Sequence, residues 1–173
     1  MVRAFGKSWG IVLLAVALAG CSTAYWEIGN DRSGDNIAEE IENYSNATKE
    51  LTLPPDASWP SSGTVFDFVL NDPEPHHLQE GYGSMRAQEL WHCAWQFEAV
   101  ETKDKSRKSK ALETLELFKD MKVYKDSDSS FTNHVDDILA KAKLGDFSPM
   151  AENTANCMRT WIYPNPTETK PPK

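Results

Sequence analysis

The chain has 173 residues, with 18 Lys or Arg against 26 Asp or Glu, so its formal net charge at pH 7 is −8. This acidic balance argues against nucleic acid as a partner and against electrostatic attraction to anionic lipid headgroups. The length beyond the first 20 residues suits one ordinary domain with a core of its own.

The first predicted element is an export signal over residues 1–20. Arg3 and Lys7 supply positive charge, and residues 11–19 form an apolar run that is too short to cross a ~30 Å hydrocarbon core. An uncleaved N-terminal anchor or a buried helix is the alternative interpretation. The small residues before Cys21 favour a cleaved signal.

The four residues Leu18-Ala19-Gly20-Cys21 resemble the lipobox of bacterial lipoproteins. The resemblance implies a diacylglyceryl group on the Cys21 thiol and cleavage just before it, and two acyl chains suffice for stable membrane anchoring. It places the mature protein on the extracytoplasmic face of the cell membrane. In a Gram-negative host, Ser22 favours the outer membrane.

Residues 21–35 are expected to be a tether between the lipid and the domain, because they mix Gly, Ser and Asp. The first helix is predicted over residues 36–49, where apolar residues recur every three or four positions. Asn36 and Glu39 fit a capping box, and Glu40 is expected on the solvent side of this helix.

The next part of the chain is predicted to contain no helix. Residues 51–62 include three prolines, which remove backbone donors and hold the preceding residues extended. Residues 64–70 have strand character without a partner strand, so they are expected to be an extended segment packed on helices. Residues 71–83 are predicted to form a turn-rich loop.

The strongest helix is predicted over residues 84–102, with Ser84 as N-cap and one broad apolar face that includes Trp91 and Trp95. The basic run 103–110 is expected to be solvated, and either to break the helix or to form an exposed joint.

Three further helices are predicted towards the C-terminus. One covers residues 111–123, and one follows the polar linker 126–130 and ends at Gly145. The last starts at Ser148, as N-cap, and runs through Ile162. Residues 164–173 are expected to be a Pro-rich disordered tail.

Cys93 and Cys157 are expected to form a disulfide, because two thiols outside the cytoplasm commonly pair. The bond would close a loop of about 65 residues and stabilise the fold by about 4 kcal/mol on chain-entropy grounds. A redox pair or half of a metal site is the alternative. The resulting fold is an all-α bundle of four or five helices over residues 36–163, with one extended Pro-rich segment and a disulfide staple.

Two groups of side chains are candidates for ligand binding. Trp59 and Tyr82 lie in predicted loops and would suit an aromatic platform for a sugar or a peptide, although core packing also accounts for tryptophans. His76 and His77 form the single histidine pair, for which a solvated loop is the simpler explanation and metal binding the alternative. No catalytic residue, cofactor or metal site is predicted.

A second resemblance covers roughly residues 51–100. It rests on short motifs that are similar to those of small exported actinobacterial proteins with no assigned function. The resemblance implies an envelope protein and carries over no catalytic residue. The motifs are Leu53-Pro54-Pro55, Ser58-Trp59-Pro60, Gly81-Tyr82-Gly83 and Trp91-His92-Cys93-Ala94-Trp95.

Three functions remain open at this point. The first is a non-enzymatic, lipid-anchored envelope protein that interacts with another envelope protein or supports the cell surface. The second is a lipoprotein that captures a ligand through its loop aromatics. The third is a hydrolase, which would require two buried carboxylates that face each other.

Overall fold

Helices account for all the regular structure in residues 36–72, 74 and 76–164, the part of the chain that the computed structural model describes. This confirms the all-α prediction. The helices of seven or more residues are α2 (Ile37–Glu50), α5 (Tyr82–Glu101), α6 (Lys105–Leu115), α8 (Ser129–Lys143) and α9 (Ser148–Thr154). The shorter ones are α3 (Ser62–Val65), α4 (Asp67–Leu70), the 3-10 helix η1 (Glu116–Asp120), α7 (Lys122–Lys125) and α10 (Arg159–Ile162).

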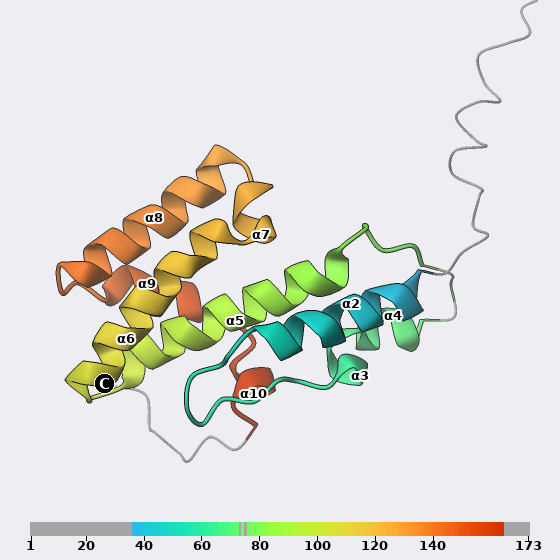
Figure 1. Ribbon diagram of the computed structural model, residues 1–173, viewed down its shortest axis with the longest axis horizontal. Helices are drawn as coiled ribbons and strands as arrows, with labels where there is room; N and C mark the ends of the chain where they lie inside the picture. The colour runs from blue at the N-terminus through green and yellow to red at the C-terminus, as the bar shows by residue number, and fades with distance from the viewer. Residues whose placement is uncertain (1–35, 73, 75, 165–173) are drawn as a thin grey trace, which may run out of the picture. The chain divides into compact units, whose positions relative to one another are not determined.

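Helix α5 lies between two groups of buried apolar side chains and packs against α2, α6, α7 and α9 (Figure 1). One group includes Trp91 and Trp95 and extends into α6, η1, α7, α8 and α9. The other includes Leu90 and Phe97 and extends into α2, α3, α4 and α10. A helix with apolar neighbours on two sides is buried around most of its circumference. Phe97, predicted at the edge of the apolar face, is therefore buried as well.

Two tryptophans of α5 bind the irregular segment between α2 and α3. The indole N–H groups of Trp91 and Trp95 both donate to the carbonyl oxygen of Thr52, at 2.9 and 3.0 Å. The two rings meet edge to face with their centroids 6.3 Å apart, as predicted from their spacing of four residues. Trp91 and Trp95 are therefore core residues whose polar atoms are satisfied.

The expectation of an extended segment at residues 64–70 is wrong, because this stretch forms α3 and α4. Ser61 caps α3 by accepting a hydrogen bond from the Thr64 amide, at 3.2 Å. Helical turns place Val65, Phe66 and Val69 together in the core. Without a neighbouring strand to pair with, β-propensity is overridden by this burial.

Two predicted helices are interrupted. Residues 111–123 are divided by the extended backbone of Met121, which places Val123 in the core and leaves Lys122 exposed. Residues 148–162 are divided between α9 and α10, so Cys157 lies between helices. In a continuous helix Cys157 and Ile162 would point about 140° apart. In the observed structure Cys157 is bonded to Cys93 of α5, and Ile162 is buried in the apolar group that includes Leu90 and Phe97.

The predicted start and end of α8 are confirmed. Asp128 caps the helix by accepting from the amides of Ser130 and Phe131, and Gly145 follows its C-terminus with a φ of 94°. Ser148 does not cap α9 as predicted. It is the first residue of that helix, and its amide donates to the Asp146 carboxylate at 3.0 Å.

Candidate functional site

The residues that would carry the lipid anchor lie outside the described part of the chain. This applies to Cys21, to the predicted signal over residues 1–20, to the predicted tether over 21–35 and to residues 165–173 of the predicted tail. Lipidation of Cys21 stays a prediction.

Trp59 and Tyr82 are both integrated into a chain of aromatic contacts around α2. Tyr44 packs edge to face against Trp59 on one side and Phe66 on the other, with centroid distances of 6.3 and 6.1 Å. Phe66 in turn packs against Tyr82 at 5.9 Å. Tyr82 is the first residue of α5, where a loop was predicted. Both candidates are partly buried and serve to pack α2, α3 and α5 together.

The centre of this aromatic chain is locked by a hydrogen bond. The Tyr44 hydroxyl donates to the carbonyl oxygen of Pro60 at 2.8 Å, and Tyr44 is only 3% exposed. Burial of the phenol raises its pKa, so the hydroxyl remains a donor at physiological pH. This bond positions Pro60, and with it Trp59, against α2.

The histidine pair lies in the loop before α5. The His76 imidazole is 3.0 Å from the Asp72 carboxylate, and His77 is exposed. Hydrogen bonds to the Glu74 amide and to His76 lower the pKa of Asp72. Within the described residues, no group of three or more His, Cys, Asp or Glu side chains is arranged to hold a metal ion.

A shallow depression of about 220 Å³ lies between the start of α5 and α7. The candidates Trp59, Tyr82, His76 and His77 do not line it, so the structure does not bring them together around this hollow. The residues that line it are Gln79, Glu80, Gly81, Met85, Lys122, Val123, Asp126 and Ser127.

The carboxylate of Glu40 is buried at the start of α5, although it was expected on the solvent side of α2. It is 1% exposed and accepts hydrogen bonds from the amides of Gly81 and Gly83, each at 2.8 Å. These amides belong to the first turn of α5, whose donors have no partner within the helix. Glu40 therefore caps a helix far away in the sequence, and the negative charge suits the positive end of the helix dipole.

The close approach of α2 and α5 depends on a glycine. A Cβ on Gly83 would lie 1.8 Å from the backbone oxygen of Glu40.

Asn36, expected as a capping-box residue, makes no side-chain cap bond. Instead its amide group exchanges two hydrogen bonds with the Leu78 backbone, at 2.8 and 2.9 Å. The spacing of Asn36, Glu40 and Tyr44 at four-residue intervals was the signal that these side chains share a face.

A second buried carboxylate, Glu98, is near the other end of α5. It is 6% exposed and receives two hydrogen bonds from the Arg107 guanidinium, at 2.6 and 2.8 Å. The bond to Glu98 raises the pKa of Arg107. Gly83, which Glu40 contacts, and Glu98 are 15 residues apart in α5, or about 22 Å along its axis. Glu40 and Glu98 therefore do not face each other as a catalytic pair would.

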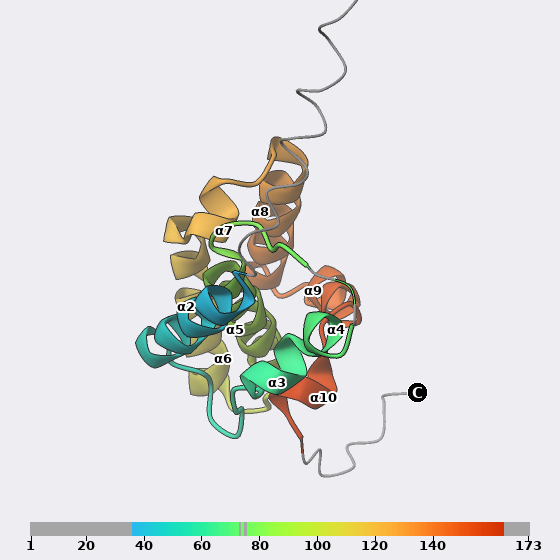
Figure 2. The ribbon, with the colours of Figure 1, turned by 90° about the vertical axis from the view of Figure 1, so that its right-hand side faces the viewer.

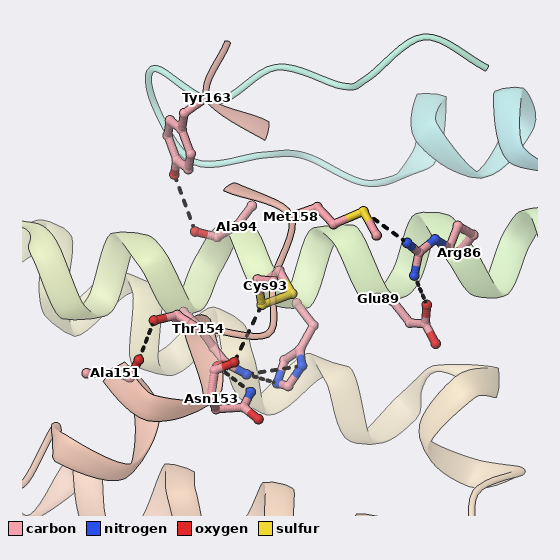
Figure 3. Close-up of a disulfide and its surroundings, with 12 residues drawn as sticks. Arg86, Glu89, Cys93, Ala94, Ala151, Asn153, Thr154, Met158 and Tyr163 are labelled. Atoms are coloured by element: carbon pink, nitrogen blue, oxygen red, sulfur yellow. Dashed lines mark hydrogen bonds and ion pairs between the residues drawn. A yellow bond between two sulfur atoms is a disulfide. The ribbon is translucent and has the colours of Figure 1, made fainter. Parts of the chain in front are cut away.

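The disulfide between Cys93 and Cys157 is confirmed, with the two Cα atoms 5.8 Å apart, and Figure 3 shows it joining α5 to the segment after α9. Neighbouring contacts fasten the same segment. Arg86 donates to the Met158 sulfur at 3.6 Å, and the Tyr163 hydroxyl donates to the Ala94 carbonyl at 3.4 Å (Figure 3). The disulfide and these contacts together hold the segment after α9 against α5.

His92 has the most perturbed imidazole. Its ring stacks on Phe118 with centroids 3.8 Å apart, and Gln96 bonds to it at 2.9 Å. Asn153 fixes Gln96 by donating to its side-chain oxygen at 2.8 Å. Burial lowers the pKa of His92 to about 3, so the ring is neutral at physiological pH and contributes packing.

Comparison of the chain with protein-family models, with curated proteins and with solved structures finds no match. None of the described helices is long and apolar enough to cross a membrane. The argument for function therefore rests on the residues themselves.

Proposed function

We propose that this protein is a lipid-anchored component of a bacterial cell envelope, whose helical domain is a non-enzymatic interaction module. The observation that carries the proposal is the sequence Leu18-Ala19-Gly20-Cys21 at the end of an apolar run. The Cys93–Cys157 disulfide supports it, because such bonds persist in the oxidising compartments outside the cytoplasm.

The use of the domain's polar groups supports a non-enzymatic role. Glu40 caps α5, Glu98 binds Arg107, and the neutral His92 packs on Phe118. Each of these groups, two buried and one partly buried, has a structural partner, which leaves the described surface as the functional part of the domain.

Replacement of Cys21 tests the anchor. We expect the wild-type chain in the membrane fraction of the producing cell, extracted by detergent only, and the Cys21→Ala variant either unprocessed or released. Ser22→Ala, which retains the thiol, is the matched control and should fractionate as wild type. Equal membrane retention of the Cys21→Ala variant after cleavage would contradict the proposal.

Photocrosslinking in intact cells tests the interaction role. A photoreactive side chain placed at exposed positions such as Phe68, Lys105 or Leu144 should give a discrete adduct from one face of the domain. The absence of any adduct from all three positions would contradict a role in interaction.

A further inference from the structure

The described domain segregates its positive charge. Arg86, Arg107, Arg159 and five lysines each pair with a carboxylate in residues 36–72, 74 and 76–164, and Lys49 bonds to Asn46. Apart from Lys49, the lysines without an ion pair in that part of the chain all lie within eight residues. They are Lys103, Lys105, Lys108 and Lys110, here called the lysine patch.

The lysine patch surrounds the first turns of α6. Lys103, Lys105 and Lys110 are exposed, whereas Lys108 lies over the Phe147 ring at 4.2 Å. The carboxylates nearby already have hydrogen-bond or ion-pair partners, and the exposed Asp56 lies 3.7 Å from Arg107. Asp104 accepts from two amides at the start of α6, and Arg107 binds Glu98. Glu113 is the next exposed carboxylate along α6, and it accepts a hydrogen bond from Ser109 at 3.3 Å.

The surroundings of the lysine patch identify the kind of partner. Protein interfaces are built around buried aromatic or apolar anchors. The exposed large apolar side chains of the described residues are Phe68, Leu70, Leu117, Phe131, Leu144 and Met158, and none lies within residues 101–113. A surface with flexible lysines and serine hydroxyls suits a ligand held by charge density.

The lysine patch lies at one end of the helical domain. In Figure 1, α6 begins at the end of α5 that is distant from the first turn of α2, and in Figure 2 it lies behind α2 and α5. The 20 residues of α5 span about 30 Å.

We propose that the lysine patch binds a flexible anionic polymer of the envelope that carries closely spaced phosphate groups. Lysine ammonium groups bind phosphate oxygens as point charges, without the planar geometry that arginine imposes. The placing of the polymer in the envelope rests on the proposed function, whereas the binding itself does not.

Binding of linear inorganic polyphosphate to the full chain in non-ionic detergent tests the proposal. We expect an affinity that falls steeply with salt, and a loss of about tenfold or more in the triple variant Lys103→Gln, Lys105→Gln, Lys110→Gln. The matched control is Lys49→Gln, Lys125→Gln, Lys141→Gln, which changes the net charge equally at exposed positions and should retain near-wild-type binding.

Three results would overturn the proposal. They are no binding by the wild-type chain, equal weakening in both triple variants, and binding to vesicles of anionic lipid without binding to polyphosphate. Circular dichroism of both variants checks that the helices are retained. Because the assay uses the isolated protein, its failure is distinguishable from failure of the anchor, which the fractionation of the Cys21→Ala variant reports separately.

Discussion

A buried carboxylate lies at each end of α5. Glu40, from α2, contacts the first turn of α5, and Glu98 lies in the last turns of α5 itself, but their partners are of different kinds. Glu40 is held by two backbone amides of the helix start, and no cation is bonded to it within the described residues. Glu98 is held by a guanidinium from the next helix. A buried charge can thus be stabilised by helix-terminal donors or by a counter-ion, and the first solution leaves no pattern of opposite charges in the sequence.

The largest expected effect is at the close contact beside Glu40. Gly83→Ala should lower the free energy of unfolding by about 4 kcal/mol, because the new Cβ would collide with backbone that has little room to move. Gly63→Ala is the control, since its nearest neighbour would be a serine hydroxyl at 3.8 Å. Urea denaturation followed by circular dichroism measures both, and a similar small effect in the two variants would refute the tight α2–α5 contact.

Removal of the carboxylate itself should be nearly as costly. Glu40→Ala leaves the buried amides of Gly81 and Gly83 without acceptors, and we expect a loss of about 3 kcal/mol in the free energy of unfolding. Glu39→Ala, at an exposed neighbouring position, should change it by less than about 0.5 kcal/mol. Equal losses in the free energy of unfolding for the two variants would show that the Glu40 side chain lies on the solvent side of α2.

At the other end of α5, removal of the cation should have an intermediate effect. Arg107→Met leaves the buried Glu98 without its counter-ion, and we expect a loss of about 2 kcal/mol, moderated because Arg107 is itself 40% exposed. Lys141→Met breaks an exposed pair with Asp137 and should cost less than about 0.5 kcal/mol. If both variants unfold like wild type in urea, Glu98 does not depend on a counter-ion.

The effect that is smallest at neutral pH concerns the middle of α5 and appears only as pH dependence. His92 has a pKa of about 3 in the folded protein, below its unfolded value of about 6.5, so the unfolded state binds more protons between these values. Stability should therefore fall as the pH drops through this window. In His92→Asn the slope should decrease by up to about 1.4 kcal/mol per pH unit. Unfolding midpoints at pH 7, 5 and 4 measure it, and identical slopes would show that His92 titrates normally.

The elements that the sequence predicted correctly are those with a long, regular apolar pattern. The faces of α5 and α8 follow from spacing alone, and the disulfide follows from two thiols in a chain with a predicted export signal. A helix start at the polar linker 126–130 was also predicted, and Asp128 within this linker caps α8.

The elements that the sequence did not predict depend on contacts between distant residues. Glu40 was assigned to solvent because its partners are amides about 40 residues away, and backbone amides carry no sequence signal. Residues 64–70 are helical because helical turns bury Phe66 and Val69 together in the core, and this burial outweighs their local preference for β structure. The basic run 103–110 was visible in the sequence, but the pairing of most other cations is visible only in three dimensions.

The intact mass of the membrane-extracted protein reports both the lipid anchor and the disulfide. We expect the mass of residues 21–173 with a diacylglyceryl group on the Cys21 sulfur, and alkylation of Cys93 and Cys157 only after reduction. A full-length mass without lipid, or two thiols that react before reduction, would contradict this expectation.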